Sequence, residues 1–243
     1  SPEYNTEIVE NLLWSLLYNQ LPNIVTEDTE IILLCLNGDF LHIDNVQHST
    51  TRGTSLVGDS TGSYLQLYSK ALNFLIRYVN KLCTEYPNSE IILPLVPGNH
   101  DLVSTRHLGL ALECYYSENK QVTILSSEEN YQFVRYGATL LGFTHGDEKL
   151  KDPKVLAGLL MSMQPRDYAE TKTRSWHLGH NHRAGEKFLE EFGILLRYFP
   201  SITTNNLWSR ERAYINQTRA VEVLTFDFDH GYIKTDHISV SKL

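Results

Sequence analysis

The chain has 243 residues, and its 42% hydrophobic and 21% charged content is typical of a globular protein, which argues against a disordered chain. Its formal net charge of −8 argues against a broad basic surface for nucleic acid, and no apolar run approaches the roughly 20 residues that cross a bilayer. Three widely spaced cysteines form a poor disulfide framework and favour a reducing, cytoplasmic compartment.

In the first third of the chain, helical spacing of apolar side chains predicts an amphipathic helix over residues 1–20. The apolar run 31–36 predicts a buried strand that ends in the turn Asn37-Gly38-Asp39. Residues 45–63 are rich in Ser, Thr and Gly and are expected to form a long loop. The periodicity of residues 65–83 then predicts a second helix.

The middle of the chain contains a second apolar run, 91–96, which predicts a buried strand ending at Pro97-Gly98-Asn99. Pro94 is unfavourable in a central strand, because it has no N–H for the ladder. Residues 106–116 are predicted to be helical. A third buried strand is expected at residues 138–143, directly before the turn that carries His145.

After that turn, Asp152 followed by Pro153 predicts the N-cap and first position of a helix that reaches about Met163. A short strand is expected at residues 176–178. On an extended segment Trp176 faces the core and His177 the opposite side.

The last third is mostly strand, with predicted strands at residues 193–198, 220–226 and 232–240. No repeat or linker interrupts the chain. The change from alternating helix and strand to consecutive strands predicts an α/β (α+β) fold of sheets flanked by helices, in a single domain over residues 1–243.

Four predicted strands each end in a turn that carries a potential metal ligand, and these ligands are Asp39, Asn99, His145 and the pair His180 and His182. The carboxyl ends of strands in a layered α/β fold meet at one edge, where ligand sites form. A glycine beside each ligand permits a sharp turn. A single loop histidine is more often structural, but four coincident turns favour a shared metal site.

The types of ligand indicate the chemistry. Imidazole, carboxylate and amide oxygen together suit Mn, Fe or Zn, and the lack of thiolates disfavours a structural zinc finger. Two ions about 3.5–4 Å apart can bridge a phosphate and generate hydroxide for in-line attack. Asp39 is the natural bridging carboxylate, whereas His180 and His182 share a face of an extended segment and could each serve a different ion.

Four motifs resemble, in order, motifs two to five of the calcineurin-like metallophosphoesterases: Gly38-Asp39-Phe40-Leu41-His42, Gly98-Asn99-His100-Asp101, Thr144-His145-Gly146-Asp147 and Gly179-His180-Asn181-His182. The resemblance covers residues 31–182. The second motif, with histidine at position 42, resembles that of the DNA-repair nuclease branch. The segment Thr50-Thr51-Arg52-Gly53-Thr54 resembles uncharacterised phage and prophage members. The resemblance implies a four-layer αββα sandwich of two mixed sheets flanked by helices.

The resemblance also assigns roles to the candidate ligands. It implies that Asp39 bridges two metal ions. Asn99, His145 and His180 would complete one metal site, and His182 would contribute to the other.

The same resemblance implies catalytic roles. His100 is the expected acid–base residue near the leaving oxygen, oriented by Asp101, because imidazole can donate a proton near neutral pH. His42 would contact substrate phosphate or assist protonation, and a solvent-facing loop residue is the equal alternative. Arg52 is expected to bind substrate phosphate, whereas Arg135 and other lone arginines are expected to be solvated.

The first motif of the family, Asp-x-His, is not found before residue 20. The chain begins Ser1-Pro2-Glu3 without an initiator Met or a signal peptide, so we expect it to be the remainder of a longer polypeptide. A chain that begins at Ser1 is expected to bind one metal ion well and the second poorly, and to have weak activity.

The sequence therefore predicts a hydrolase of phosphate esters that uses two divalent metal ions, Mn²⁺ first and Fe or Zn as alternatives. The favoured reaction is hydrolysis of a phosphodiester in DNA or RNA by metal-activated hydroxide, because the metal site supplies positive charge locally. A phosphomonoesterase or small-nucleotide phosphodiesterase is the alternative, since it needs no basic groove. A non-catalytic scaffold of the same fold is a third reading, and no membrane partner is expected.

Overall fold

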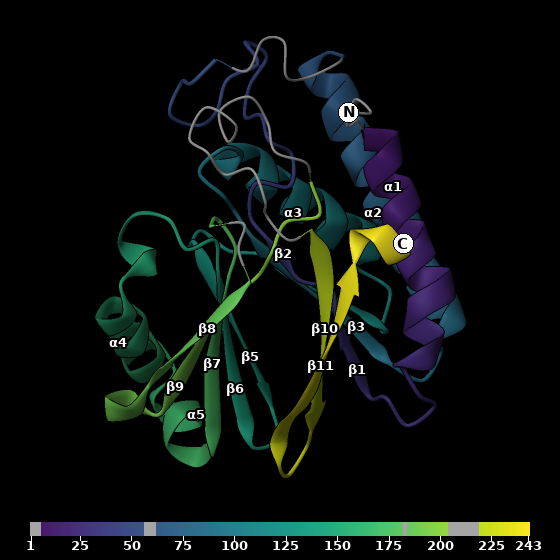
Figure 1. The fold of residues 1–243 in the computed structure, drawn as a ribbon. Helices are drawn as coiled ribbons and strands as arrows, with labels where there is room; N and C mark the ends of the chain where they lie inside the picture. The colour runs from purple at the N-terminus through teal and green to yellow at the C-terminus, as the bar shows by residue number, and fades with distance from the viewer. Residues whose placement is uncertain (1–5, 56–61, 182–183, 204–218) are drawn as a thin grey trace. The chain divides into compact units, whose positions relative to one another are not determined.

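The computed structural model describes residues 6–55, 62–181, 184–203 and 219–243 and has mixed α/β structure (Figure 1). Its internal contacts define two compact units, Ser1–Glu129 with Leu243 and Asn130–Lys242. Sheets flanked by helices confirm the predicted α/β class, while the four-layer order and the single domain over residues 1–243 remain predictions. Within the described ranges, no helix is long and apolar enough to cross a membrane.

The first unit contains four strands, all paired in parallel: β1 (Ile31–Leu33), β2 (Leu36–Asn37), β3 (Glu90–Val96) and β4 (Val122–Leu125). The strand predicted over residues 31–36 is therefore divided. The pairing register continues across the break, because Leu33 pairs with Ile92 and Leu36 with Leu95. The two intervening residues thus lie opposite Leu93 and Pro94. Proline has no N–H to donate, which explains the interruption.

The helices of the first unit are α1 (Thr6–Ser15), α2 (Tyr64–Glu85) and α3 (Leu102–Tyr116), with a π turn at Leu16–Gln20 and a 3-10 turn at Leu21–Asn23 after α1. Helix α1 lies along α2 (Figure 1), where the ring of Trp14 is 5.9 Å from that of Phe74 and 5.2 Å from that of Tyr78. The helix predicted at residues 65–83 is confirmed, and the helix predicted at residues 1–20 is confirmed from Thr6 on, since residues 1–5 lie outside the described part of the chain. Helix α3 begins four residues before its predicted start.

The second unit contains a five-stranded mixed sheet and a separate hairpin. Along the sheet the strands are β5 (Tyr131–Tyr136), β6 (Thr139–Thr144), β7 (Thr173–Leu178), β9 (Ile194–Tyr198) and β8 (Gly185–Leu189). The hairpin pairs β10 (Ala220–Asp227) with β11 (Gly231–Ser239). The inner strands β6, β7 and β9 are parallel and were predicted. The outer strands β5 and β8 were missed, because they are mostly exposed or half-exposed and lack a continuous apolar run.

Helices α4 (Pro153–Met163) and α5 (Pro165–Glu170) belong to this unit, with 3-10 turns at Glu148–Lys151, Glu190–Phe192 and Val240–Lys242. Asp152 accepts a hydrogen bond from the Lys154 backbone N at 2.8 Å, which confirms the predicted N-cap. On the α4 side of the sheet, Nε1 of the buried Trp176 donates to the carbonyl oxygen of Leu156 at 2.9 Å. His177 contacts Phe143 on the other side, as predicted.

Candidate metal centre

The turns that follow β2 and β3 lie side by side, because Asn37 pairs with Val96 where the two parallel strands end. The backbone N of His100 donates to Oδ1 of Asp39 at 2.9 Å, which joins the two turns directly. Gly98 permits this approach. A Cβ atom at Gly98 would overlap the carboxylate and the backbone nitrogen of Asp39, so a larger residue would displace that side chain.

Asp101 is completely buried, with 0% exposure, and joins the same two turns. Its carboxylate accepts hydrogen bonds from the backbone N–H groups of Asp39 at 3.2 Å, Leu41 at 2.8 Å and Gly98 at 2.9 Å. Burial raises the pKa of Asp101 and the nearby Asp39 carboxylate raises it further, whereas the hydrogen bonds from Leu41 and Gly98 oppose the shift. Asp101 therefore fixes the backbone of the turns on either side of His100.

His42 and His100 meet between these turns. Their Nδ1 atoms are 3.1 Å apart and their ring centroids 4.9 Å apart, so one Nδ1 donates a proton to the other. The contact engages Nδ1 of His100, and Nε2 is the ring nitrogen that takes no part in it. Both histidines are half-buried, and the interpretation of His42 as an isolated solvent-facing residue does not account for this contact.

Strained backbone marks the candidate residues. Among the described residues, five non-glycine residues have a left-handed φ, and three of these are candidate site residues: Asp39 at 56°, His42 at 64° and His180 at 58°. Such a conformation costs on the order of 1–3 kcal/mol and persists where the surroundings enforce it. Asp and His tolerate it better than most residues, which explains their suitability at these turns.

In the second unit, His145 and His180 follow the parallel strands β6 and β7. Thr144 pairs with Leu178, so both histidines leave the sheet at the same edge. Nε2 of His145 lies 3.0 Å from Nδ1 of His180. Two nitrogens bound at right angles to one ion, each at about 2.1 Å, would be about 3.0 Å apart, so the pair fits a shared metal ion. His145 is 2% exposed, whereas His180 is exposed.

Three candidate residues have not yet been placed: Asn99, Arg52 and His182. Asn99 is half-buried in the turn between Gly98 and His100, and Arg52 is exposed in the turn formed by residues 50–54. His182 lies outside the described residues. The structure therefore shows contacts among Asp39, His42 and His100 and between His145 and His180, while the roles of Asn99, Arg52 and His182 stay predictions.

Arg135, one of the arginines expected to be solvated, is engaged by acidic side chains. Its Nη1 lies 2.9 Å from Asp167 and 2.6 Å from Glu170. It therefore forms part of a charged surface network and offers less positive charge to a phosphate.

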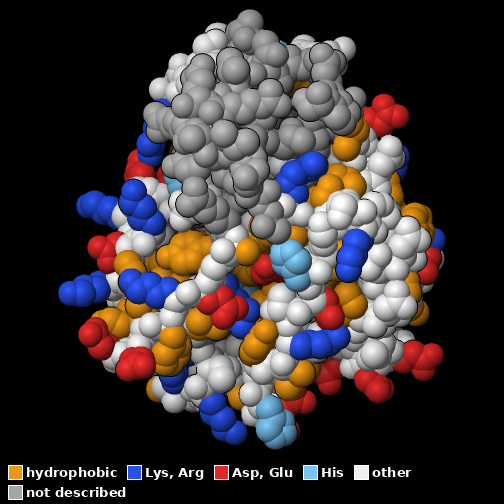
Figure 2. Space-filling model, viewed as in Figure 1, with side chains coloured by type: hydrophobic (Ala, Val, Ile, Leu, Met, Phe, Trp, Pro, Cys, Tyr) orange, Lys and Arg blue, Asp and Glu red, His pale blue; other side chains and the backbone are white. Residues whose placement is uncertain are grey.

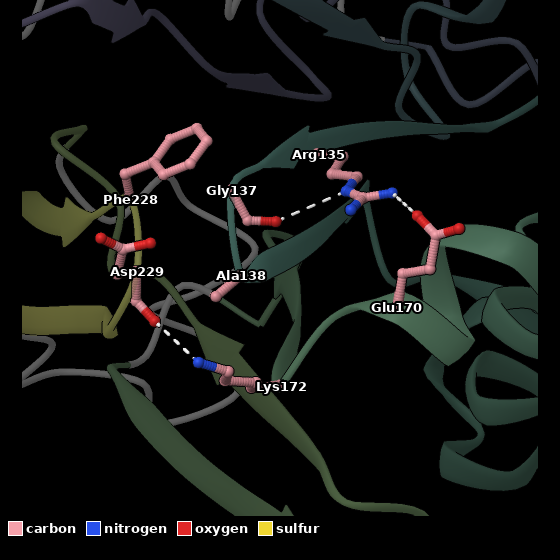
Figure 3. Close-up of a pocket in the computed structure, with 7 residues that line it drawn as sticks. All are labelled: Arg135, Gly137, Ala138, Glu170, Lys172, Phe228 and Asp229. Carbon is pink, nitrogen blue, oxygen red and sulfur yellow. Dashed lines mark hydrogen bonds and ion pairs between the residues drawn. The ribbon is translucent and has the colours of Figure 1, made fainter.

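A shallow pocket of about 450 Å³ in the second unit includes this arginine (Figure 3). It is lined by Arg135, Gly137, Ala138, Glu170, Lys172, Phe228 and Asp229. Ala138 and Lys172 immediately precede β6 and β7, whereas His145 and His180 follow these strands. The pocket is therefore at the end of β6 and β7 opposite to the two histidines, and its lining contains no candidate ligand.

One residue beside the site had no role in the sequence analysis. Asp44 is 8% exposed, and its Oδ1 accepts a hydrogen bond from the backbone N of Ser104 at 2.7 Å. No local pattern indicates this contact, because Asp101 directly precedes helix α3 and has the position of its N-cap.

On the face drawn in Figure 2, acidic and basic side chains of the described residues are interspersed. Among the described residues of that face this distribution leaves no basic stripe of the kind that tracks a nucleic-acid backbone, in agreement with the formal net charge of −8.

Comparisons with known proteins find no matching protein-family model and no matching curated protein. Among solved structures, a Vps29 double mutant from Entamoeba histolytica has 13% identity and a TM-score of 0.33, covering 62% of this chain and 81% of that chain. Vacuolar Protein Sorting 29 from Cryptosporidium parvum has 14% identity and a TM-score of 0.31, covering 67% and 87%. A conserved uncharacterized protein from Streptococcus pneumoniae, described as a predicted phosphoesterase, has 13% identity and a TM-score of 0.26, covering 66% and 88%. These TM-scores do not assign the chain to a family.

Proposed function

We propose that the chain is a metal-dependent phosphoesterase that hydrolyses a phosphodiester. The observation that carries this proposal is that motif residues far apart in the sequence are in direct contact within each unit. Asp39 accepts from the backbone of His100, and His145 meets His180 through ring nitrogens 3.0 Å apart. Contacts of this kind at strand ends are the usual setting of catalytic ligand sites.

The proposed metal ligands are Asp39, Asn99, His145, His180 and His182. Their carboxylate, amide and imidazole donors suit Mn²⁺, Fe or Zn, and Mn²⁺ is our first choice for both ions. When bound, the two ions would supply the positive charge that polarises the phosphate and activates water. The separation of the ring nitrogens of His145 and His180 supports a common ion for these two residues.

His100 is the proposed proton donor to the leaving oxygen. Its Nδ1 is occupied by His42, so its Nε2 would face the substrate and deliver the proton. Asp101 holds the turn that carries His100, through hydrogen bonds to the backbone of Leu41 and Gly98. Arg52, exposed in the turn formed by residues 50–54, is proposed to pair with a substrate phosphate oxygen.

The candidate substrates are a nucleic-acid phosphodiester and a smaller phosphate ester. The histidine at position 42 favours a nuclease-like diesterase by resemblance. The formal charge of −8 and the interspersed charges of Figure 2 favour a small-nucleotide phosphodiesterase or a phosphomonoesterase, which needs no extended basic groove. Both reactions use the same proposed ligands and proton donor, so only the choice of substrate separates them.

The decisive experiment is hydrolysis by the full chain with added Mn²⁺, using nitrophenyl phosphomonoester, bis-nitrophenyl phosphodiester and single-stranded DNA in parallel. We expect diester hydrolysis that chelation abolishes. Asp39→Ala and His145→Ala should each lower the rate by about a hundredfold or more, because each removes a proposed metal ligand.

The matched control is His230→Ala, because His230 is an exposed histidine in the turn between β10 and β11. This variant should keep the wild-type rate and metal affinity. Equal activity in the His145→Ala and His230→Ala proteins, or hydrolysis that survives chelation, would contradict the proposed function and favour a non-catalytic scaffold.

A further inference from the structure

Helix α3 begins directly after the His100-Asp101 pair, but its expected cap is used elsewhere. The first N–H groups of a helix have no partner within the helix and need other acceptors. Asp101 occupies the N-cap position and makes no side-chain cap hydrogen bond. Its carboxylate accepts instead from the turns that contain Leu41 and Gly98. Other side chains must therefore serve the start of α3.

Asp44 and Thr51, from the segment that follows His42, supply these acceptors. Oδ1 of Asp44 accepts from the Ser104 backbone N at 2.7 Å, and Oδ2 accepts from the Val103 backbone N at 3.2 Å. Oγ1 of Thr51 accepts from the Leu102 backbone N at 3.1 Å and donates to Oδ2 of Asp44 at 2.7 Å. Two side chains thus cap three successive N–H groups.

The turn that presents Thr51 is closed by its own hydrogen bonds. The backbone N of Thr50 donates to the carbonyl oxygen of Thr54 at 2.9 Å, and the backbone N of Thr54 donates to Oγ1 of Thr50 at 3.1 Å. Gly53 has a φ of 82°, a conformation that favours glycine. Residues 50–54, which resemble phage proteins in sequence, therefore form a preorganised turn beside α3.

We propose that Asp44, supported by Thr51, is a positioning residue that sets His42 against His100. His42 is two residues before Asp44, and His100 is two residues before Leu102, so the cap ties together the two segments that carry the histidines. A shift of either segment would change the Nδ1–Nδ1 distance of 3.1 Å and misdirect Nε2 of His100. The catalytic consequence rests on the proposed function, whereas the effect on the histidine pair does not.

The kinetic test compares Mn²⁺-loaded full chains on two aryl phosphodiesters that differ only in leaving-group pKa. A general acid matters most for a poor leaving group. Asp44→Ala should therefore lower kcat about tenfold or more for the poor leaving group and less than about threefold for the good one. Asp44→Asn, which retains an acceptor oxygen, should restore part of the loss.

The matched control is Asp152→Ala, because Asp152 caps helix α4 through a bond of 2.8 Å to the Lys154 backbone N. It removes a cap of the same chemistry from the other unit. The ratio of the two rates should stay at the wild-type value in this variant. An Asp44→Ala protein that loses both activities in equal proportion, as a merely destabilised protein would, overturns the proposal.

A spectroscopic test is independent of activity. In histidine-ring ¹H–¹⁵N spectra of the metal-free full chain, Asp44→Ala should move the signals of His42 and His100 and leave that of the buried His177 unchanged. Should Asp44→Ala fail to fold, Thr51→Val removes one hydroxyl group and should give a smaller shift of the same two signals. Absence of hydrolysis by the wild type would end the proposed function, whereas unchanged His42 and His100 signals in a folded variant would end this inference.

Discussion

The two groups of candidate residues occupy equivalent positions at the ends of parallel strands, but they are held differently. The turns after β2 and β3 are held by carboxylates: Asp101 accepts three backbone N–H groups, and Asp39 accepts one. His145 instead directly follows β6, whose six residues are all buried. Turns at strand ends can thus be held in place either by buried hydrogen bonds or by the packing of the sheet. Replacing a carboxylate should therefore destabilise the turns after β2 and β3 more than the turn after β6.

The largest expected effect is that of Asp101→Ala on the stability of the first unit. Three backbone N–H groups would lose a buried acceptor, and each unsatisfied group costs about 1–3 kcal/mol. We expect the free energy of unfolding to fall by about 3 kcal/mol or more, measured by urea denaturation.

Asp227→Ala is the matched control for that measurement. Asp227 also accepts backbone N–H groups, from Asp229 at 3.0 Å and His230 at 2.8 Å, but its side chain is 46% exposed to solvent. Its loss should lower the free energy of unfolding much less than the loss of Asp101, because water can replace the acceptor. Similar losses in the two variants would remove the distinction between buried and exposed carboxylates on which the comparison depends.

The second prediction concerns close packing within the first group. Gly98→Ala would place a Cβ against Asp39, and overpacking of this kind costs about 1–3 kcal/mol. We expect weaker Mn²⁺ binding, measured by calorimetry, because the Asp39 carboxylate must move. Gly185→Ala, where a Cβ meets nothing within 4 Å, should bind as the wild type does. Equal affinity in all three proteins would show that Asp39 tolerates the added methyl group.

The third prediction uses a buried histidine of the second unit that is outside the candidate group. His177 is 5% exposed, and burial, followed by the nearby Arg197 guanidinium, lowers its pKa from 6.5 to about 3. Below pH 6.5 the unfolded chain takes up a proton that the folded protein does not. Acidification therefore favours the unfolded chain. The free energy of unfolding keeps its full value above pH 6.5 with respect to His177, and below that pH it falls by no more than about 1.4 kcal/mol per pH unit.

This dependence can be measured as urea-unfolding free energies of the wild type and His177→Leu between pH 7 and pH 4. The variant should have a shallower slope, because the residue that takes up the proton on unfolding is gone. The control is Leu178→Val, a substitution of a buried residue on the same strand that removes no titrating group, and it should keep the wild-type slope. Parallel slopes for the wild type and His177→Leu would assign the acid sensitivity to other groups.

The smallest expected effect is a stabilisation. Gly158 is an exposed residue inside helix α4, and a Cβ there meets no atom within 4 Å. Alanine should raise the free energy of unfolding by about 0.5–1 kcal/mol, because glycine loses more backbone entropy in a helix. A thermal melt that shows a lower Tm for Gly158→Ala would contradict the packing of this helix.

The sequence predicted what depends on continuous apolar runs and missed what depends on contacts across the chain. The buried strands β3 and β6 follow from such runs, and so do the turns that carry Asn99 and His145. The division of β1 from β2 was not predicted, because it requires knowing that Pro94 lies opposite the gap.

The exchange of capping roles was also not predictable from the sequence. An Asp directly before a helix has the pattern of an N-cap, and nothing local indicates that Asp101 turns toward Leu41 and Gly98 instead. Asp44 is 60 residues from Ser104, so its capping role has no local signal. The sequence supports two interpretations of His42 equally, and only the fold shows that its ring contacts His100.

The carboxylate of Asp101 has a consequence for amide hydrogen exchange. Amides in surface turns usually exchange rapidly, because brief local openings expose them to water. The N–H groups of Leu41 and Gly98 are instead bound to an acceptor with 0% exposure. They can exchange only when the surroundings of Asp101 open. We therefore expect these two turn amides to exchange as slowly as those of the buried strand β3, which would make the turns part of the same cooperative folding unit.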